Sequence, residues 1–260
     1  ESFDMQIFNK LIFTPHLGKD HSLQILLGTQ TTDNKSSSYS SSTANTASPY
    51  LTDPSIPSRL ITQSALGIKS GNSEYRLFSA YSQFQYSFKD RYLFNVSGRM
   101  DGNSRFGSNH RWGFFPSASG RWRISGEPFL KKASDSWLNE LSLRASWGQN
   151  GNEPSTNYVA VSTYSLYDYK YLNDTGTYPS NLELANLKWE RGEQTDLGLN
   201  FAAFDNRLMI DADYYLKRTN DLFFRNVSIP STSGFSTAAY MNIGTMDNDG
   251  WELNLHLTPI

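Results

Sequence analysis

The run LMIDADYYLK at residues 208–217 decides the fold, because apolar and polar side chains alternate along almost its whole length. A period of two places successive side chains on opposite faces of a β-strand, whereas a helix would group them every three or four residues. One face of this strand is therefore expected to contact an apolar phase and the other to contact water. The apolar face holds Leu208, Ile210, Ala212, Tyr214 and Leu216, and the mostly polar face holds Met209, Asp211, Asp213, Tyr215 and Lys217.

The same alternation recurs along the chain, while helical spacing is rare. Residues 127–138 form the only stretch that suits a helix, with Pro128 in its first turn. We therefore expect an all-β chain of about ten strands. The further runs with a period of two lie at 3–13, 22–33, 78–88, 92–100, 112–124, 141–147, 197–201 and 251–257.

The connections between these runs alternate in length. Such alternation puts short turns on one rim of a meander and long loops on the other, which is typical of an antiparallel transmembrane β-barrel and not of a sandwich. Aromatic residues near the turns, such as Tyr86, Phe88, Tyr92, Phe204 and Trp251, with Trp147 and Tyr214 toward the long loops, indicate interfacial girdles. Short links are expected at 88–91, 204–207 and 247–250, medium ones at 14–21 and 126–139, and long ones at 35–74, 104–111, 150–190 and 221–237, the first including a serine-rich tract at 36–42.

Composition excludes several classes of function. The 23 Lys and Arg residues are scattered among 25 Asp and Glu residues, so no basic stripe for nucleic acid exists. The chain has no cysteine, which removes disulfides, thiolate metal sites and cysteine nucleophiles. No window approaches the 18 or so apolar residues of a transmembrane helix.

The sequence contains no recognisable motif for catalysis or for binding a metal or cofactor. The acid-rich stretch 247–250 fails the calcium-loop alignment and is expected to be a tight hairpin turn. Asp211 and Asp213 share one strand face and are expected to belong to a hydrated wall rather than to a pair of catalytic acids. We therefore predict no enzyme, no metal and no cofactor. Two alternatives stay open, namely a small closed outer-membrane barrel enzyme such as a protease, and a secreted carbohydrate-binding β-sandwich.

Five segments, in order over residues 75–258, closely resemble the SusC/RagA family of TonB-dependent outer-membrane transporters. They are RFG at 105–107 with RWGFFPSASGRWRIS at 111–125 and EPF at 127–129, LSLRASWGQNGN at 141–152, LKWE at 187–190 with QTDLG at 194–198, DYY at 213–215 with Lys217, Thr219, Asp221 and Leu222, and NIGTM at 242–246 with Asn248, Gly250, Trp251 and Glu252.

The resemblance implies that residues 1–260 form a portion of one TonB-dependent receptor β-barrel domain, without a plug domain or a signal peptide. Such barrels have about 22 strands, so the chain is expected to be truncated; its end, which lacks a terminal aromatic residue, agrees with this.

By the same resemblance, the protein would import oligosaccharides or peptides across the outer membrane with a SusD-like lipoprotein, energised by the TonB complex through the missing plug. Lipid, the rest of the barrel and its plug would be further partners, and nucleic acid would not be one. The residues expected to contact cargo or lipoprotein are Arg99, Asp101, Asp211 and Asp213 on the lumen wall, and Arg105, Tyr164, Tyr167, Tyr169, Tyr171 and Trp189 at the loops.

Overall fold

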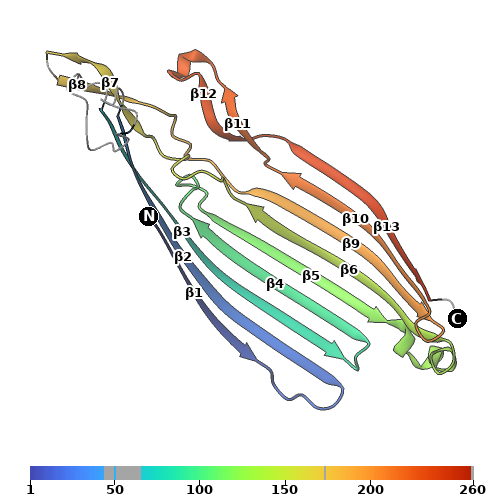
Figure 1. Ribbon diagram of the computed structural model, residues 1–260. Helices are drawn as coiled ribbons and strands as arrows, with labels where there is room; N and C mark the ends of the chain where they lie inside the picture. The colour runs from blue at the N-terminus through green and yellow to red at the C-terminus, as the bar shows by residue number, and fades with distance from the viewer. Residues whose placement is uncertain (44–49, 51–65, 173, 259–260) are drawn as a thin grey trace.

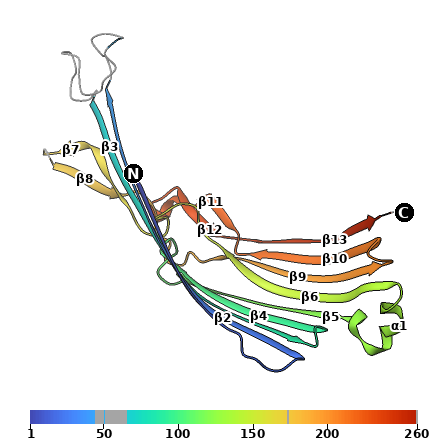
Figure 2. The ribbon, with the colours of Figure 1, turned by 60° about the horizontal axis from the view of Figure 1, so that its bottom comes forward.

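One large antiparallel sheet dominates the chain. The computed structural model describes residues 1–43, 50, 66–172 and 174–258, and of residues 42–43, 66–68 and 168–171 only the backbone. The sheet has nine strands, and β1 and β13 are its two edges. Figures 1 and 2 show it as a single curved wall. Its strands are β1 (Ser2–Phe13), β2 (His21–Thr43), β3 (Leu66–Phe88), β4 (Tyr92–Asn103), β5 (Trp112–Arg123), β6 (Leu138–Asn152), β9 (Glu190–Ala203), β10 (Leu208–Asn220) and β13 (Thr245–Leu257).

Two hairpins are inserted between strands of the wall. Along the chain, the pair β7 (Tyr164–Tyr171) and β8 (Asp174–Pro179) lies in the connection from β6 to β9. The pair β11 (Phe223–Ser228) and β12 (Thr237–Asn242) lies in the connection from β10 to β13. A short 3₁₀ turn, η4 (Ser231–Ser233), joins β11 to β12. The long connections thus carry small sheets of their own.

Within the described ranges, helical structure is confined to short turns. The helix expected over residues 127–138 is wrong in extent: the segment forms η2 (Ile124–Gly126), η3 (Pro128–Leu130) and the single turn α1 (Lys131–Ser134). Pro128 does occupy the first position of η3, as its fixed φ favours. No described helix combines the length and apolar character needed to cross a membrane.

The alternation of connection lengths is confirmed with one exception, the connection at 104–111. Connections of 3 to 14 residues, at 14–20, 89–91, 124–137 and 204–207, join the strands at one end of the wall, here called the short-turn rim. At the other end, the long-loop rim, the strands are joined by connections of 8 to 37 residues, at 44–65, 104–111, 153–189 and 221–244. All of these except 104–111 are longer than any connection of the short-turn rim. This is the strand order and loop parity of an up-and-down barrel wall, with the sheet left open.

Two expected connections are instead strand. Residues 247–250 are not a hairpin turn but lie within β13, because Asp247 faces Arg218 of β10 and accepts two hydrogen bonds from its guanidinium, at 2.7 and 2.9 Å. Trp251 consequently lies beside Tyr214 in mid-strand and not next to a turn. The serine-rich tract likewise extends β2, since its backbone pairs with β3 from Ser36 to Thr43.

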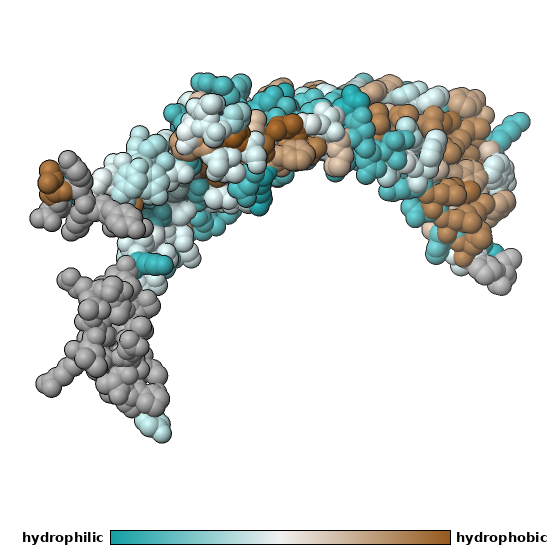
Figure 3. Space-filling view, turned by 90° about the horizontal axis from the view of Figure 1, so that it is seen from above, coloured by the Kyte–Doolittle hydropathy of each residue, from teal (hydrophilic) through white to brown (hydrophobic). Residues whose placement is uncertain are grey.

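The two faces of the wall differ in chemistry. The strand register places Trp122, Leu143, Leu199, Ala212 and Leu253 in one row across neighbouring strands. The apolar positions of the strands share this face, here called the apolar face, and many of them are exposed; Trp251 and Leu253 are 79% and 71% exposed. Figure 3 shows such residues gathered over the right-hand limb of the arch. The opposite, polar face is expected to bound a hydrated space.

The fold decides against both alternatives left open by the sequence. A sandwich buries its apolar side chains between two packed sheets, whereas this wall is a single layer whose apolar face is uncovered. A small closed barrel would pair its first and last strands, and the order of the described strands leaves β1 and β13 as edges. The chain is a partial antiparallel barrel.

Candidate functional site

The polar face carries a network around Arg99 near the long-loop rim. Its guanidinium Nε donates to both carboxylate oxygens of Asp101, at 2.7 and 3.0 Å. Its Nη2 donates to Ser79 at 2.9 Å and to Gln30 at 3.2 Å, which links strands β2, β3 and β4. The two expected site residues Arg99 and Asp101 are therefore brought together as a charge-neutral pair that fixes the wall.

A second ion pair crosses an intervening strand. Arg144 of β6 and Asp213 of β10 both lie opposite Gly198 of β9, and their side chains meet above it with Nη2 to Oδ2 at 2.5 Å. A Cβ atom at Gly198 would overlap Arg144 Nε and Asp213 Oδ1. Glycine at this position therefore permits two residues that are two strands apart to touch.

These residues border a shallow hollow of about 410 Å³ on the polar face. Asp211, by contrast, lies one row closer to the short-turn rim and accepts a hydrogen bond from Asn200 at 2.5 Å. Sequence reasoning selected Asp213 but missed its partner Arg144, because only the register across three strands brings them together. The hollow is lined by Arg144, Gln194, Asp196, Asp213, Tyr215, Lys217 and Glu252.

Gly198→Ala tests this crossing. The added methyl group is expected to push Arg144 and Asp213 apart and to lower the free energy of unfolding by about 1–3 kcal/mol, as overpacking typically does. Gly120→Ala is the matched control, because a Cβ there meets Phe94 carbons at an ordinary 3.7–3.8 Å. Urea titration of the whole barrel in vesicles measures the stability of both variants. Equal unfolding midpoints would contradict a contact of Arg144 with Asp213 above Gly198.

An aromatic core joins three long connections at the long-loop rim. Trp189 is 5% exposed, and its ring centroid lies 4.2 Å from that of Phe106 and 5.4 Å from that of Phe115. Its indole Nε1 donates to the carbonyl of Arg111 at 3.2 Å. Trp189 was expected to contact cargo, but its burial suits it to hold the loop base together. This loop-base core comprises Phe106, Phe115, Val159, Ala160, Leu187, Trp189 and Tyr240.

Backbone contacts reinforce the same core. Gly107 N donates to the Leu187 carbonyl at 3.1 Å, and a Cβ at Gly107 would overlap the backbone of Ala185. The side chain of Asn242 bonds the N–H and carbonyl of Lys188 at 3.1 and 2.8 Å, and also the carbonyl of Asp221 at 2.9 Å. The connections 104–111, 153–189 and 221–244 are thus held together at their base.

Arg105 clamps this core from the side. Its Nη1 lies 2.8 Å from Glu153 Oε1 and its Nε donates to Asn157 at 2.6 Å. Its guanidinium also covers the ring of Tyr75 at 3.9 Å. Asn103 donates to the other oxygen of Glu153. Arg105 is therefore engaged in the protein, and sequence reasoning missed Glu153 and Asn157 because they lie about fifty residues away in the chain.

Glu153 should make the loop base sensitive to pH. Burial is the largest influence on its carboxyl and raises its pKa above the ordinary value, although Arg105 and Asn103 oppose this. A raised carboxyl pKa means that the folded state binds the proton more tightly, so stability falls as pH rises from the ordinary pKa through the raised one. Glu153→Gln is expected to flatten this dependence. Hydrogen exchange of residues 153–160, measured over this pH range in both proteins, tests the prediction. The same dependence of stability on pH in the wild type and in Glu153→Gln would contradict it.

The β7–β8 hairpin presents tyrosines beyond the loop-base core. Tyr164 is 70% and Tyr167 is 54% exposed, and the ring of Tyr167 lies 4.6 Å from that of Tyr178. These two expected contact residues are therefore accessible. The other two, Tyr169 and Tyr171, have side chains outside the described part of the structure.

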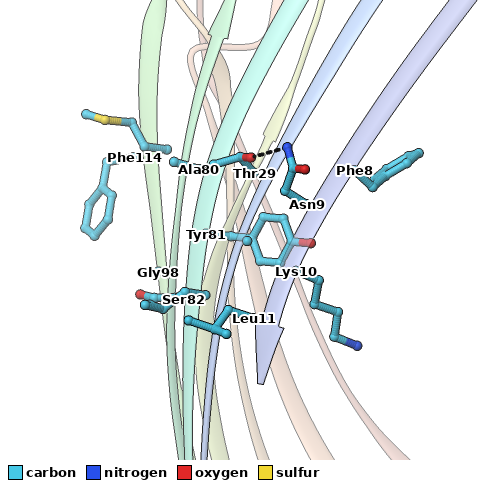
Figure 4. Close-up of a pocket in the computed structure, with 13 residues that line it drawn as sticks. Phe8, Asn9, Lys10, Leu11, Thr29, Ala80, Tyr81, Ser82, Gly98 and Phe114 are labelled. Atoms are coloured by element: carbon cyan, nitrogen blue, oxygen red, sulfur yellow. Dashed lines mark hydrogen bonds between the residues drawn. The ribbon is translucent and has the colours of Figure 1, made fainter. Parts of the chain in front are cut away.

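A further hollow lies on the apolar side of the wall. It measures about 760 Å³ and is lined by residues of β1 to β5, with small residues such as Thr29, Ala80 and Gly98 between Leu11 and Phe114. Figure 4 shows Asn9 and Thr29 joined there by a hydrogen bond of 3.3 Å. Its place opposite the polar network separates it from the expected cargo path. Among the described residues, no group of three or more His, Asp and Glu side chains is arranged to hold a metal ion.

Comparison with known proteins gives a consistent assignment. The family model described as TonB dependent receptor-like, beta-barrel, matches residues 3–258. TonB-dependent receptor P39 of Formosa agariphila is 38% identical over 184 residues, which are 71% of this chain and 17% of that protein. TonB-dependent receptor SusC of Bacteroides thetaiotaomicron is 34% identical over 191 residues, 71% of this chain and 19% of that protein. The chain thus spans less than a fifth of the length of these relatives.

Solved structures agree in fold. The RagAB peptide importer in its closed-closed state matches with a TM-score of 0.86 and 29% identity, covering 98% of this chain and 27% of that chain. The siderophore receptor PirA of Pseudomonas aeruginosa matches with a TM-score of 0.58 at 12% identity, covering 97% of this chain and 39% of that chain. At this identity the likeness shows a shared fold only.

Proposed function

Because the chain belongs to the TonB-dependent receptor β-barrel family, we propose that it forms part of the wall of an outer-membrane transporter. In this role the apolar face meets lipid, the polar face borders the lumen, the short-turn rim faces the periplasm and the long-loop rim faces the exterior. The observation that carries the proposal is the strand register, which gathers most exposed apolar side chains of the wall on one face, while the connections, except 104–111, alternate in length.

The transporter would import oligosaccharides or peptides together with a SusD-like surface lipoprotein. The likeness to SusC and to the RagAB peptide importer supports this class of cargo and partner. The TonB complex would supply the energy through a plug domain. The wall contributes a hydrophilic surface with paired charges, at Arg99 with Asp101 and at Arg144 with Asp213, which suits the passage of polar cargo.

The lipoprotein would dock on the long-loop rim. The loop-base core holds three connections as one support, and the exposed rings of Tyr164 and Tyr167 stand out from it. Tyrosine rings supply large contact areas at low entropic cost, and they also stack on sugars. We therefore assign Tyr164 and Tyr167 to lipoprotein or cargo contact, and Arg105 and Trp189 to holding the support in place.

Co-purification from outer membranes tests the proposal with the full-length protein. The double variant Tyr164→Ser, Tyr167→Ser is expected to retain its place in the membrane but to lose most of its bound lipoprotein and its TonB-dependent uptake of labelled peptides or oligosaccharides. Leu17→Ser, an exposed apolar residue at the opposite rim, is the control. A full-length protein that stays out of the outer membrane, or takes up no cargo of either class, would refute the transporter assignment.

A further inference from the structure

The connection between β5 and β6, here called the rim segment (residues 124–137), lies against the apolar face at the short-turn rim. Glu127 accepts hydrogen bonds from Tyr92 Oη at 2.6 Å and Trp122 Nε1 at 3.1 Å, and both of these rings belong to the apolar face. The hydrogen bond from Tyr92, followed by that from Trp122, lowers the pKa of Glu127, so this carboxylate stays ionised. Arg91 contacts it at 3.4 Å.

The other end of the rim segment is fastened to the same face. The ring of Trp137 lies 6.4 Å from that of Phe201, an apolar-face residue of β9, and 6.0 Å from that of Phe204. The carbonyl of Trp137 accepts a hydrogen bond from Phe204 N at 2.7 Å. With both ends attached to the apolar face, the rim segment forms a lip on the outer side of the wall, where α1 lies at the strand ends in Figure 2.

Large rings of this lip remain uncovered. Phe129 is 70% exposed, Phe204 56% and Trp137 44%. Aromatic rings gather at the boundary between hydrocarbon and headgroups, where the ring is buried and its edge stays near water. The lip continues the stacked rings of Phe88, Tyr92 and Trp122 on the apolar face at the same rim.

Positive charge accompanies these rings. Lys131 and Lys132 lie two and three residues after Phe129 and are exposed, and no described carboxylate forms an ion pair with either of them. Two other cations of this rim are paired, Lys89 with Asp20 and Arg91 with Glu127. Two adjacent cations without an acidic partner, next to interfacial rings, complement a phosphate headgroup.

We propose that the rim segment binds an anionic phospholipid, with Lys131 and Lys132 contacting its headgroup phosphate and Phe129 and Trp137 lying at the headgroup level. The inference rests on the proposed function, because it needs the apolar face to be in a bilayer. It adds a lipid site at the short-turn rim that anchors the β5–β6 connection. Binding fixes the height of the wall at this rim.

Tryptophan quenching in vesicles tests the site. The whole protein is placed in mixed vesicles of phosphatidylethanolamine and phosphatidylglycerol, with bromine atoms on the acyl chains of one lipid at a time. The Trp137→Phe variant identifies the contribution of Trp137 by difference. Stronger quenching of Trp137 by brominated phosphatidylglycerol is expected, with a preference of about fivefold for each lysine. Lys131→Gln with Lys132→Gln should abolish the preference.

The matched control changes two lysines of the polar face, as Lys10→Gln with Lys217→Gln, and should keep the preference. If the control loses it equally, or if the rim variant keeps it, the lipid site is refuted while the barrel stands, since Trp251 on the apolar face would still be quenched by either lipid. If neither brominated lipid quenches any tryptophan, the membrane-embedded wall and the lipid site are refuted together.

Discussion

Leu253→Arg is expected to destabilise the assembled barrel by about 2–4 kcal/mol, because a charged side chain at the bilayer midplane loses its hydration. Leu253 lies at the centre of the apolar run of β13, between Trp251 and Leu255, and is 71% exposed. In water such an exposed leucine would accept arginine with little change, since surface substitutions usually alter stability by less than about 0.5 kcal/mol. The size of the effect therefore reports the surroundings of this face.

The neighbouring residue supplies the control. Asn254 lies on the polar face opposite Asp211, so Asn254→Arg should be tolerated and should gain a carboxylate partner. Urea titration of the whole protein folded into vesicles, followed by the mobility of unheated samples on gels, measures both. Equal and small effects would show that the apolar face does not contact hydrocarbon.

Trp189→Ala is expected to cost about 3–5 kcal/mol at the long-loop rim, as the loss of a buried aromatic ring usually does. The substitution leaves a cavity beside Phe106 and Phe115 and removes the donor to the carbonyl of Arg111. Because the loop-base core joins three connections, their amides should lose protection together, while the strands near the short-turn rim keep theirs.

Hydrogen exchange followed by mass spectrometry measures this effect in the whole protein. Tyr164→Ala is the control, because its ring is 70% exposed and contributes little to the core. Loss of protection in the connection 153–189 alone would mean that the three connections are independent of one another, and would contradict the shared core.

The alternation of side chains predicts much of this fold. The run at 208–217 forms β10 with its two faces as expected, and the connections of the nine-stranded wall alternate in length as expected except at 104–111. Both features are local consequences of a period of two and of hairpin connectivity.

The wrong predictions of turns and loops concern segments where hydrogen bonding to a neighbouring strand overrides the local conformational preference of the sequence. The stretch 247–250 has the composition of a turn, yet Arg218 across the ladder holds Asp247 in a strand. The serine-rich tract is extended for a similar reason, since β3 satisfies its backbone groups. The composition of a segment does not show which strand will pair with it.

The candidate site was only half predictable. Arg99 and Asp101 are two residues apart on one strand, so their meeting follows from the alternation. Arg144 meets Asp213 only because Gly198 lies between them, and Arg105 meets Glu153 only because two connections converge. Trp189 looked accessible because it sits in a polar connection, but the fold buries it. Such contacts depend on register and on loop packing, which residue spacing does not encode.

The orientation of the wall in a bilayer is measured most directly by spin labels along β10. The chain has no cysteine. After any cysteines elsewhere in the whole protein are replaced by serine, single cysteines introduced from Ile210 to Leu216 can each carry a nitroxide. Collision with oxygen, which concentrates in hydrocarbon, is expected to be high at 210, 212, 214 and 216 and low at 211, 213 and 215. Collision with a water-soluble nickel complex is expected to show the reverse. Uniform collision along the strand, or an alternation of the opposite phase, would contradict the lipid-facing wall.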